Sequence, residues 1–296
     1  MKITPLAADS FGARSMATLV ETPDVVVLVD PSVRLGPRRY GLPPHPTEEE
    51  RQKVLWRSIR DAAKRADVLT VSHYHYDHHN PDAPSIFRGK TAFLKDGTSH
   101  INASQRERAG AFVRALKSYP KEIQVADGND VDFGGTELTF SPAVPHGHTD
   151  ELGYVVMTRI AQGGEVFVHT SDVLGPPLKA HLAFILDSDP TVLYVDGPMT
   201  HMPENYPAAE ARKSIANLLR ILRTTRIRTL IVDHHLLRDR DWVDRIAQVV
   251  AVGKENGVAV VTAAQYLGRA VEQLEANRDA LYGVSKTPPS EEPNSR

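Results

Sequence analysis

One short segment carries most of the information in this 296-residue sequence, Val68-Leu69-Thr70-Val71-Ser72-His73-Tyr74-His75-Tyr76-Asp77-His78-His79. Its first half is aliphatic and β-branched, which predicts a short buried strand over residues 67–72. Its second half places four histidines and an aspartate directly after that strand. A lone histidine is usually solvated or packed, but four of them at a strand end are typical of metal ligands. The segment therefore predicts a metal centre at the end of a buried strand.

Two further histidine pairs follow apolar segments, His146 with His148 and His234 with His235. Loops at one edge of a sheet can bring such side chains together although they are distant in sequence. Imidazole and carboxylate ligands suit zinc, iron or manganese. The chain contains no cysteine, which excludes thiolate ligands, disulfides and cysteine nucleophiles.

Composition and charge narrow the class of protein further. The hydrophobic content of 41% is that of an ordinary folded protein with a substantial core. The net charge of -2 provides no overall field that would attract nucleic acid or an anionic membrane. The sequence has no signal-peptide pattern and no apolar run of the roughly 20 residues that span a bilayer. We expect a cytoplasmic protein with a small-molecule substrate, no membrane contact and no preference for nucleic acid; a homo-oligomer is compatible with the sequence.

The wider pattern predicts an α/β fold made of two β-rich halves, each with helices on its outside. Strands are expected at residues 2–7, 15–21, 25–29, 67–72, 122–126, 137–140, 153–158, 165–170, 191–195, 229–232 and 258–262. Helices are expected at residues 47–66, 103–118, 208–224, 241–256 and 263–280. This order predicts a four-layer αββα sandwich in a single domain over residues 1–284. The Pro, Ser and Glu content of residues 285–296 predicts a disordered tail.

The histidine segment resembles a known family signature. The spacing His73-x-His75-x-Asp77-His78 resembles the first histidine motif of the metallo-β-lactamase superfamily. The other stations of that family also appear in order, with Asp30 at the end of an early strand before this motif and His146 or His148, Asp172 and His234 after it. Residues 1–18, 38–44 and 234–239 further resemble the archaeal UPF0282 group of metallo-hydrolases. The resemblance extends from the first strands to about residue 240 and implies the metallo-β-lactamase fold. It indicates the fold more strongly than the substrate.

The resemblance implies a centre of two divalent ions, with zinc favoured and iron or manganese also suitable. One ion would be held by His73, His75 and a third histidine, and the other by Asp77, His78 and His234, with Asp172 bridging. His146 follows an apolar segment with proline, whereas Gly147-His148-Thr149 resembles glyoxalase-like members. We favour His146 and keep His148 as the alternative.

Two residues are candidates for direct catalytic roles. The paired ions would lower the pKa of a bridging water, and Asp77 would orient the resulting hydroxide while it also serves as a ligand. His235, next to the favoured ligand His234, is a candidate proton donor or outer-shell residue.

For the candidate outer-shell and substrate-binding residues, the sequence leaves an ordinary structural role open beside the functional one. Metal-bound imidazoles donate their second N–H to an acceptor, for which Asp30, Asp196 and Asp233 are candidates, although a turn or cap position suits each of them. Arg38 and Arg39, with Tyr40, could hold a phosphate through the planar guanidinium fork, and a solvated surface run is an equal alternative. His201 is a further candidate for the pocket wall, although an ordinary surface position suits it better.

The function predicted from these residues is metal-dependent hydrolysis. Paired ions suit in-line displacement at phosphorus, which favours a phosphodiester substrate. Two alternatives remain open. A thioester or carboxylic-ester hydrolase like glyoxalase II would use His148 and an apolar pocket, and a metal-binding sensor would show no turnover.

Overall fold

The strand that precedes the histidine segment lies inside a six-stranded sheet. The computed structural model describes residues 1–284; the predicted disordered tail lies outside them. The sheet contains β1 (Lys2–Pro5), β2 (Thr18–Glu21), β3 (Val26–Val29), β4 (Val68–Val71), β5 (Thr91–Leu94) and β6 (Glu122–Val125), in chain order. The first three strands are antiparallel, and β3 to β6 are parallel.

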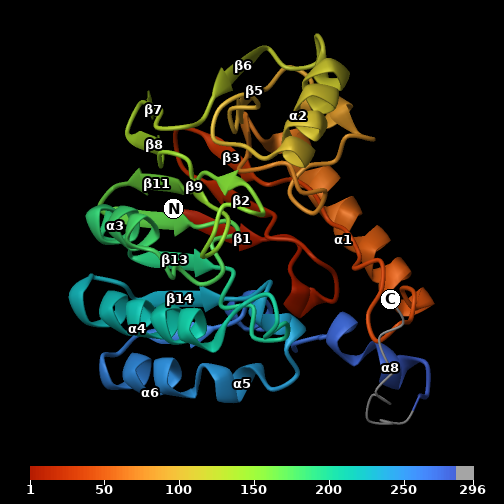
Figure 1. Ribbon diagram of the computed structural model, residues 1–296. Helices are drawn as coiled ribbons and strands as arrows, with labels where there is room; N and C mark the ends of the chain where they lie inside the picture. Colours follow the sequence, from red (N-terminus) through yellow and green to blue (C-terminus); the bar gives the residue numbers. More distant parts are fainter. Residues whose placement is uncertain (285–296) are drawn as a thin grey trace.

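A second sheet of seven strands faces the first (Figure 1). Its order is β15 (Ala259–Val261), β14 (Thr229–Val232), β13 (Val192–Val195), β12 (Glu165–His169), β11 (Thr158–Gln162), β8 (Thr136–Phe140) and β7 (Asp130–Phe133). Strands β12 to β15 are parallel, and β7, β8, β11 and β12 form an antiparallel meander. A separate pair, β9 (Val144–Pro145) and β10 (Tyr154–Val155), lies outside both sheets.

Alternation of side chains along the strands builds the layers. Val27 and Val29 meet Phe167 and Ile231 in a core of buried residues between the two sheets. The intervening side chain, Leu28, faces the opposite way because successive residues of a strand point to opposite faces. The fold is therefore a sandwich with one core between the sheets and one outside each sheet.

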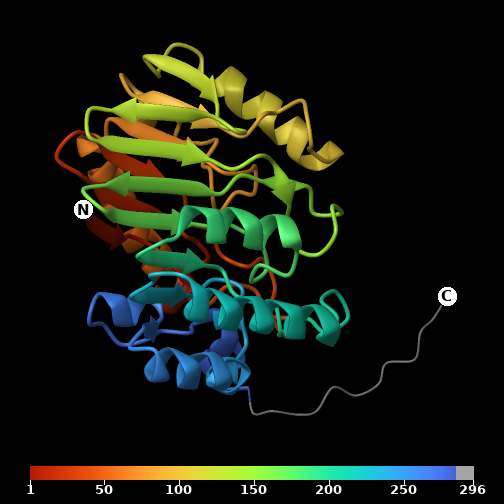
Figure 2. The same ribbon diagram turned by 90° about the vertical axis from the view of Figure 1, so that its left-hand side faces the viewer.

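Helices cover the two outer faces of the sandwich (Figures 1 and 2). Leu28 packs with residues of α1 (Pro46–Arg65) and α2 (Ala103–Leu116) outside the first sheet. Leu193 and Val232 pack with residues of α3 (Lys179–Ser188), α4 (Ala208–Thr224) and α6 (Ala247–Glu255) outside the second. The predicted four-layer αββα architecture is confirmed. None of the described helices is both long and apolar enough to cross a membrane.

The C-terminal segment differs from the prediction of one helix over residues 263–280. It forms α7 (Ala263–Tyr266), a 3-10 turn (Glu275–Asn277) and α8 (Arg278–Leu281). The break has a local reason, because Gly268 adopts a positive φ of 66° directly after α7, which is a common way for a helix to end. Further along, Arg278 is fully buried and forms an ion pair with Glu48 at the start of α1, with an Nε to Oε2 distance of 2.8 Å. Arg278 also donates to the carbonyl oxygens of Gly36 and Leu42.

Other differences are local. Strands β5, β7, β9 and β11 and helix α3 were not predicted. The helix predicted over residues 241–256 divides at Ile246 into α5 (Trp242–Arg245) and α6. Strands of four or five residues carry little periodic signal, so neighbouring strands in the sheet define them more than their own sequence does.

Candidate metal centre

The predicted metal ligands gather where strands of both sheets end. His73 follows β4, His146 follows β9, Asp172 follows β12 and His234 follows β14. The backbone turns sharply at several of these strand ends, and His234 adopts a positive φ of 51°. A positive φ costs free energy in a residue that has a Cβ, and residues in this conformation are concentrated at functional sites. The turns direct the side chains toward one point between the sheets.

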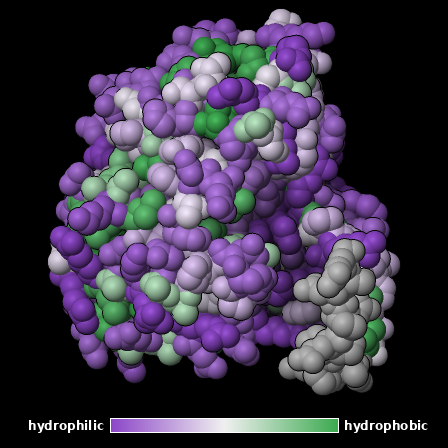
Figure 3. Space-filling model, in the orientation of Figure 1, coloured by the Kyte–Doolittle hydropathy of each residue, from purple (hydrophilic) through white to green (hydrophobic). Residues whose placement is uncertain are grey.

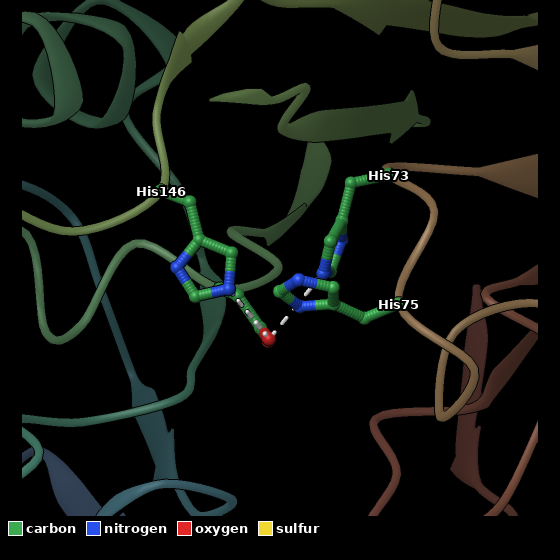
Figure 4. A group of neighbouring side chains, drawn as sticks. His73, His75 and His146 are labelled. Carbon is green, nitrogen blue, oxygen red and sulfur yellow. Dashed lines mark ion pairs between the residues drawn. The ribbon is translucent and has the colours of Figure 1, made fainter. Parts of the chain in front are cut away.

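The first ligand group comprises His73, His75, His146 and Asp172, whose ligand atoms all lie within 4.8 Å of one another. Asp172 Oδ2 lies 3.5 Å from His73 Nε2 and 3.2 Å from His146 Nε2. Figure 4 shows His73 and His75 entering from one side and His146 from the other, with their rings turned toward one another. Three imidazoles and one carboxylate oxygen thus surround a common point.

A second group lies on the other side of the same carboxylate. It comprises Asp77, His78 and His234. Asp172 Oδ1 lies 3.2 Å from His78 Nε2 and 3.4 Å from His234 Nε2. Each oxygen of Asp172 therefore faces a different set of imidazoles, as a bridging carboxylate would.

Buried atoms without hydrogen-bond partners test whether metal ions fit these groups. Within the described part of the chain, four buried atoms of these groups have no hydrogen-bond partner: His73 Nε2, His78 Nε2, His146 Nε2 and Asp172 Oδ1. Unpaired buried polar atoms cost free energy, so several of them converging on one point need an explanation. Divalent cations supply it, because imidazole and carboxylate are their ordinary ligands.

The protonation states of His73 and His78 are also compatible with the binding of cations. Burial, with the neighbouring His78, lowers the pKa of His73 to about 4, so this imidazole is neutral near pH 7 and free to ligate. Burial would lower the pKa of His78, but Asp172 and Asp30 beside it raise that pKa well above its usual range. In the metal-free protein a proton on His78 thus offsets part of the negative charge of Asp172 and Asp30. Binding of a cation is expected to release this proton.

Carboxylates outside the ligand groups orient the imidazoles. His78 Nδ1 donates to Asp30 Oδ2 at 2.8 Å, and His234 Nδ1 donates to Asp9 Oδ2 at 2.6 Å. His235 Nδ1 lies 3.0 Å from Asp196 Oδ2. Burial and the nearby Asp172 raise the pKa of Asp196 to about 8. Asp30 and Asp196 thus each contact the Nδ1 atom of a histidine of the centre, as an outer-shell carboxylate would.

Asp233 does not contact an imidazole. Its carboxylate accepts hydrogen bonds from the backbone N–H groups of Ser10, His234 and Ala263, so it stabilises the turn after β14. The outer-shell role considered for Asp233 is corrected to this backbone role.

Two residues of the centre, Asp9 and Arg238, were not predicted as site residues. Arg238 was noted only as part of a resemblance. Its Nε donates to Asp9 Oδ1 at 3.0 Å, and its Nη2 lies 3.7 Å from Asp77 Oδ2. Asp9 and His234 are 225 positions apart, so no local pattern links them. The position of Arg238 four residues after His234 was the local pattern that could have indicated its place in the centre.

A cleft of about 690 Å³ opens over the ligand groups. Ligands and other residues line it: Arg14, Arg34, Leu35, Pro37, His75, Tyr76, Asp77, Pro81, Asp82, Arg108, His146, Leu152, Asp172, His235 and Arg238. The wall therefore carries four arginines. His235 lies in this wall with Nε2 3.9 Å from Asp172 Oδ2, and it could also complete a ligand group with Asp172 and His234.

The residues predicted to bind substrate are not among those that line the cleft. Arg38 donates to the carbonyl oxygen of Gly41, and Arg39 donates to that of Arg238. The Tyr40 hydroxyl donates to the carbonyl oxygen of Ala276. His201 is half-buried outside this lining, where burial and the nearby Arg238 lower its pKa to about 3. The substrate-binding role of these four residues therefore stays a prediction, and in the described part of the chain none of them lines this cleft.

The choice between His146 and His148 leads to a prediction. The structure places His146 in the first group, whereas the ring of His148 lies against Tyr206 with centroids 5.4 Å apart. We expect His146→Ala to bind fewer divalent ions per chain than the parent protein. His148→Ala should bind as many as the parent, as measured by elemental analysis after dialysis. Equal losses in the two variants would contradict the arrangement.

A model of the β-lactamase superfamily domain matches residues 13–219. A UPF0282 protein of Korarchaeum cryptofilum is 45% identical over 293 residues, which are 98% of this chain and 97% of that protein. The metallo-β-lactamase fold protein YhfI from Bacillus subtilis superposes with a TM-score of 0.54 at 14% identity, covering 91% of this chain and 96% of its own. Zn²⁺-bound PqqB from Methylobacterium extorquens gives 0.54 at 13% identity, with 88% and 98% covered.

Proposed function

The chain belongs to the β-lactamase superfamily and, within it, to the UPF0282 family; from this premise we propose that it is a hydrolase of phosphodiesters with two divalent metal ions. The observation that carries the proposal is the position of Asp172 between two ligand groups, at the floor of a cleft lined by four arginines. The guanidinium groups suit a substrate that is anionic before the reaction starts. A neutral thioester or carboxylic ester would gain little from them.

The ligand sets define what the ions would do. His73, His75 and His146 would hold one ion, Asp77, His78 and His234 the other, and Asp172 would contact both. Zinc is the favoured ion, because a structural neighbour, PqqB, binds it and because histidine-rich sites suit it. When bound, such ions lower the pKa of water and neutralise charge on a phosphoryl oxygen.

The protein's own groups would orient the reactants. Asp77 lines the cleft, and its carboxylate lies 3.6 Å from His234 Nε2, a position from which it can orient the attacking water. Arg238 lies beside Asp77 and would pair with a non-bridging oxygen of the diester. Asp9 fixes both Arg238 and His234 through its two carboxylate oxygens.

His235 is the proposed proton donor to the leaving oxygen, and it would act together with Asp196. Burial and the nearby Arg238 lower the pKa of His235 well below its usual range, so near pH 7 the proton of this pair lies on Asp196 and would reach the leaving oxygen through the His235 ring. This ring lines the cleft, and Asp196 holds Nδ1 so that Nε2 faces the reaction centre. Asp196 in turn accepts the backbone N–H groups of Leu174 and Gly175, which keep it in place. Water would add to phosphorus, the ester oxygen would leave with this proton, and a monoester and an alcohol would result.

A panel of substrates tests the proposal. Protein reconstituted with zinc should have its highest kcat/KM on bis(4-nitrophenyl) phosphate, compared with 4-nitrophenyl phosphate, 4-nitrophenyl acetate, a thioester and a chromogenic lactam. Chelation should abolish this activity and added zinc should restore it. A preference for the thioester or the acetate would support a glyoxalase II-like hydrolase instead. A protein that carries two zinc ions and turns over none of the panel would support a metal-binding sensor.

A further inference from the structure

The four arginines of the cleft differ in how their charge is balanced. Arg14 forms a short ion pair with Glu275, which is almost buried, and Arg238 donates to the buried Asp9. These two guanidinium groups are held by carboxylates inside the protein. Arg34 and Arg108 are not held in this way, and both contact the ring of Tyr76.

Arg34 and Arg108 meet at the ring of Tyr76. Their guanidinium carbons lie 5.6 Å and 4.7 Å from the centre of that ring. Tyr76 as a whole residue is 42% exposed. Tyr76 lies between the ligands His75 and Asp77 in the sequence, so the pair of cations is adjacent to the metal centre. Cation–π contact fixes the two side chains without neutralising them.

The charge of this pair is left largely unbalanced. Over residues 1–284 no carboxylate pairs with Arg108, whose Nη1 makes a weak contact of 3.4 Å with the carbonyl oxygen of Tyr74. Arg34 Nη2 lies 3.0 Å from Asp82 Oδ2, but the Asp82 side chain is 78% exposed. Ion pairs between solvent-exposed side chains contribute little to the free energy of folding. Arg34 Nε is buried and has no hydrogen-bond partner in the described part of the chain. Two guanidinium groups are thus available to a ligand in the cleft.

We infer that the natural substrate carries a second anionic group, a phosphate or a carboxylate, which Arg34 and Arg108 bind while the scissile diester lies at the metal centre. This inference rests on the proposed function. Arginine presents a planar fork of donors that matches both kinds of anion, and two such forks on one rigid ring form a defined subsite. The face of the molecule shown in Figure 3 is mainly hydrophilic. The cleft volume of about 690 Å³ suits a small molecule with two charges.

A matched pair of chromogenic diesters tests the subsite. The two substrates are 4-nitrophenyl phenyl phosphate and the same diester with a carboxylate on the phenyl ring. Zinc-reconstituted protein should favour the second in kcat/KM, mainly through a lower KM. Arg108→Ala should reduce that preference by roughly tenfold to a hundredfold, as expected for a lost charge-assisted hydrogen bond. Arg108→Lys should keep part of the preference, since it retains charge without the fork.

The matched control is Arg106→Ala, on the exposed side of the same helix and outside the cleft lining. It should leave the preference unchanged. Thermal unfolding of each variant checks that the fold is intact, and Arg34→Gln provides a second variant of the subsite. Turnover of both diesters without a preference, or a preference that survives Arg108→Ala and Arg34→Gln, would overturn the inference and leave the proposed hydrolase standing.

Calorimetry separates the subsite from catalysis. Phenyl phosphate and its carboxylated counterpart are titrated into the zinc-reconstituted protein and into Arg108→Ala. Tighter binding of the carboxylated compound that depends on Arg108 would support the anion subsite even if neither diester is hydrolysed, in which case the proposed function alone fails. Equal binding of the two compounds by the parent protein would overturn the subsite.

Discussion

Replacing Asp172 with alanine is expected to remove both metal ions and to lower kcat/KM on a phosphodiester by at least about a thousandfold, because paired ions supply several kcal/mol of transition-state stabilisation. Each oxygen of this carboxylate faces imidazoles of a different ligand group, at 3.2 Å from His78 Nε2 and 3.2 Å from His146 Nε2. Loss of the carboxylate also leaves buried imidazoles from both groups with neither a cation nor a counter-charge. The measurement is zinc content and kcat/KM on the same sample.

Two variants control this experiment. Asp172→Asn keeps the size of the side chain but removes the charge, so it should bind less zinc than the parent and more than Asp172→Ala. Asp150→Asn changes an exposed carboxylate outside the cleft lining and should behave like the parent. If Asp172→Ala folds, keeps two zinc ions and turns over the diester at the parental rate, the bridging arrangement is wrong.

Replacing His235 with alanine is expected to lower kcat/KM by about a hundredfold to ten-thousandfold on diesters with an alkoxide leaving group, the range typical of a lost general acid. The loss should be much smaller when the leaving group is 4-nitrophenolate, because this anion is stable without a proton. The prediction follows from the geometry, in which His235 lines the cleft and Asp196 holds its Nδ1 at 3.0 Å. The slope of log kcat/KM against leaving-group pKa measures it.

Metal analysis distinguishes proton donation from ligation. His235 lies close enough to Asp172 and His234 to serve as a ligand. A proton donor can be removed without loss of zinc, and the slope against leaving-group pKa then becomes steeper. If His235→Ala instead loses an ion and slows all leaving groups equally, His235 is a ligand. Asp196→Asn should show a weaker form of the same change in slope, since it acts through the orientation of His235.

Several features of the centre could be predicted from the sequence because they are local. His73, His75, Asp77 and His78 lie within six positions after a strand that is recognisable from its own apolar residues. Asp172 and His234 likewise follow strands. The four-layer fold was predictable for a similar reason, since the alternation of strands and helices restricts how the layers can pack.

The wall of the cleft could not be predicted in this way. Arg38 and Arg39 form the more conspicuous basic pair in the sequence, yet their guanidinium groups donate to backbone carbonyls. Arg34 and Arg108 come from a loop and a helix 74 positions apart and meet only at Tyr76. Asp9 reaches His234 across most of the chain. The direction of a long side chain depends on what packs around it, which local sequence does not contain.

The residue types of the metal centre and the layered fold are thus properties of the sequence, because strand periodicity and ligand spacing are short-range patterns. The pairing of each imidazole with its carboxylate, the position of His146 rather than His148 in the first group and the charge of the cleft wall arise only when the two sheets face each other. They depend on contacts between segments far apart in the chain, whose geometry is set by the packing of the sandwich as a whole.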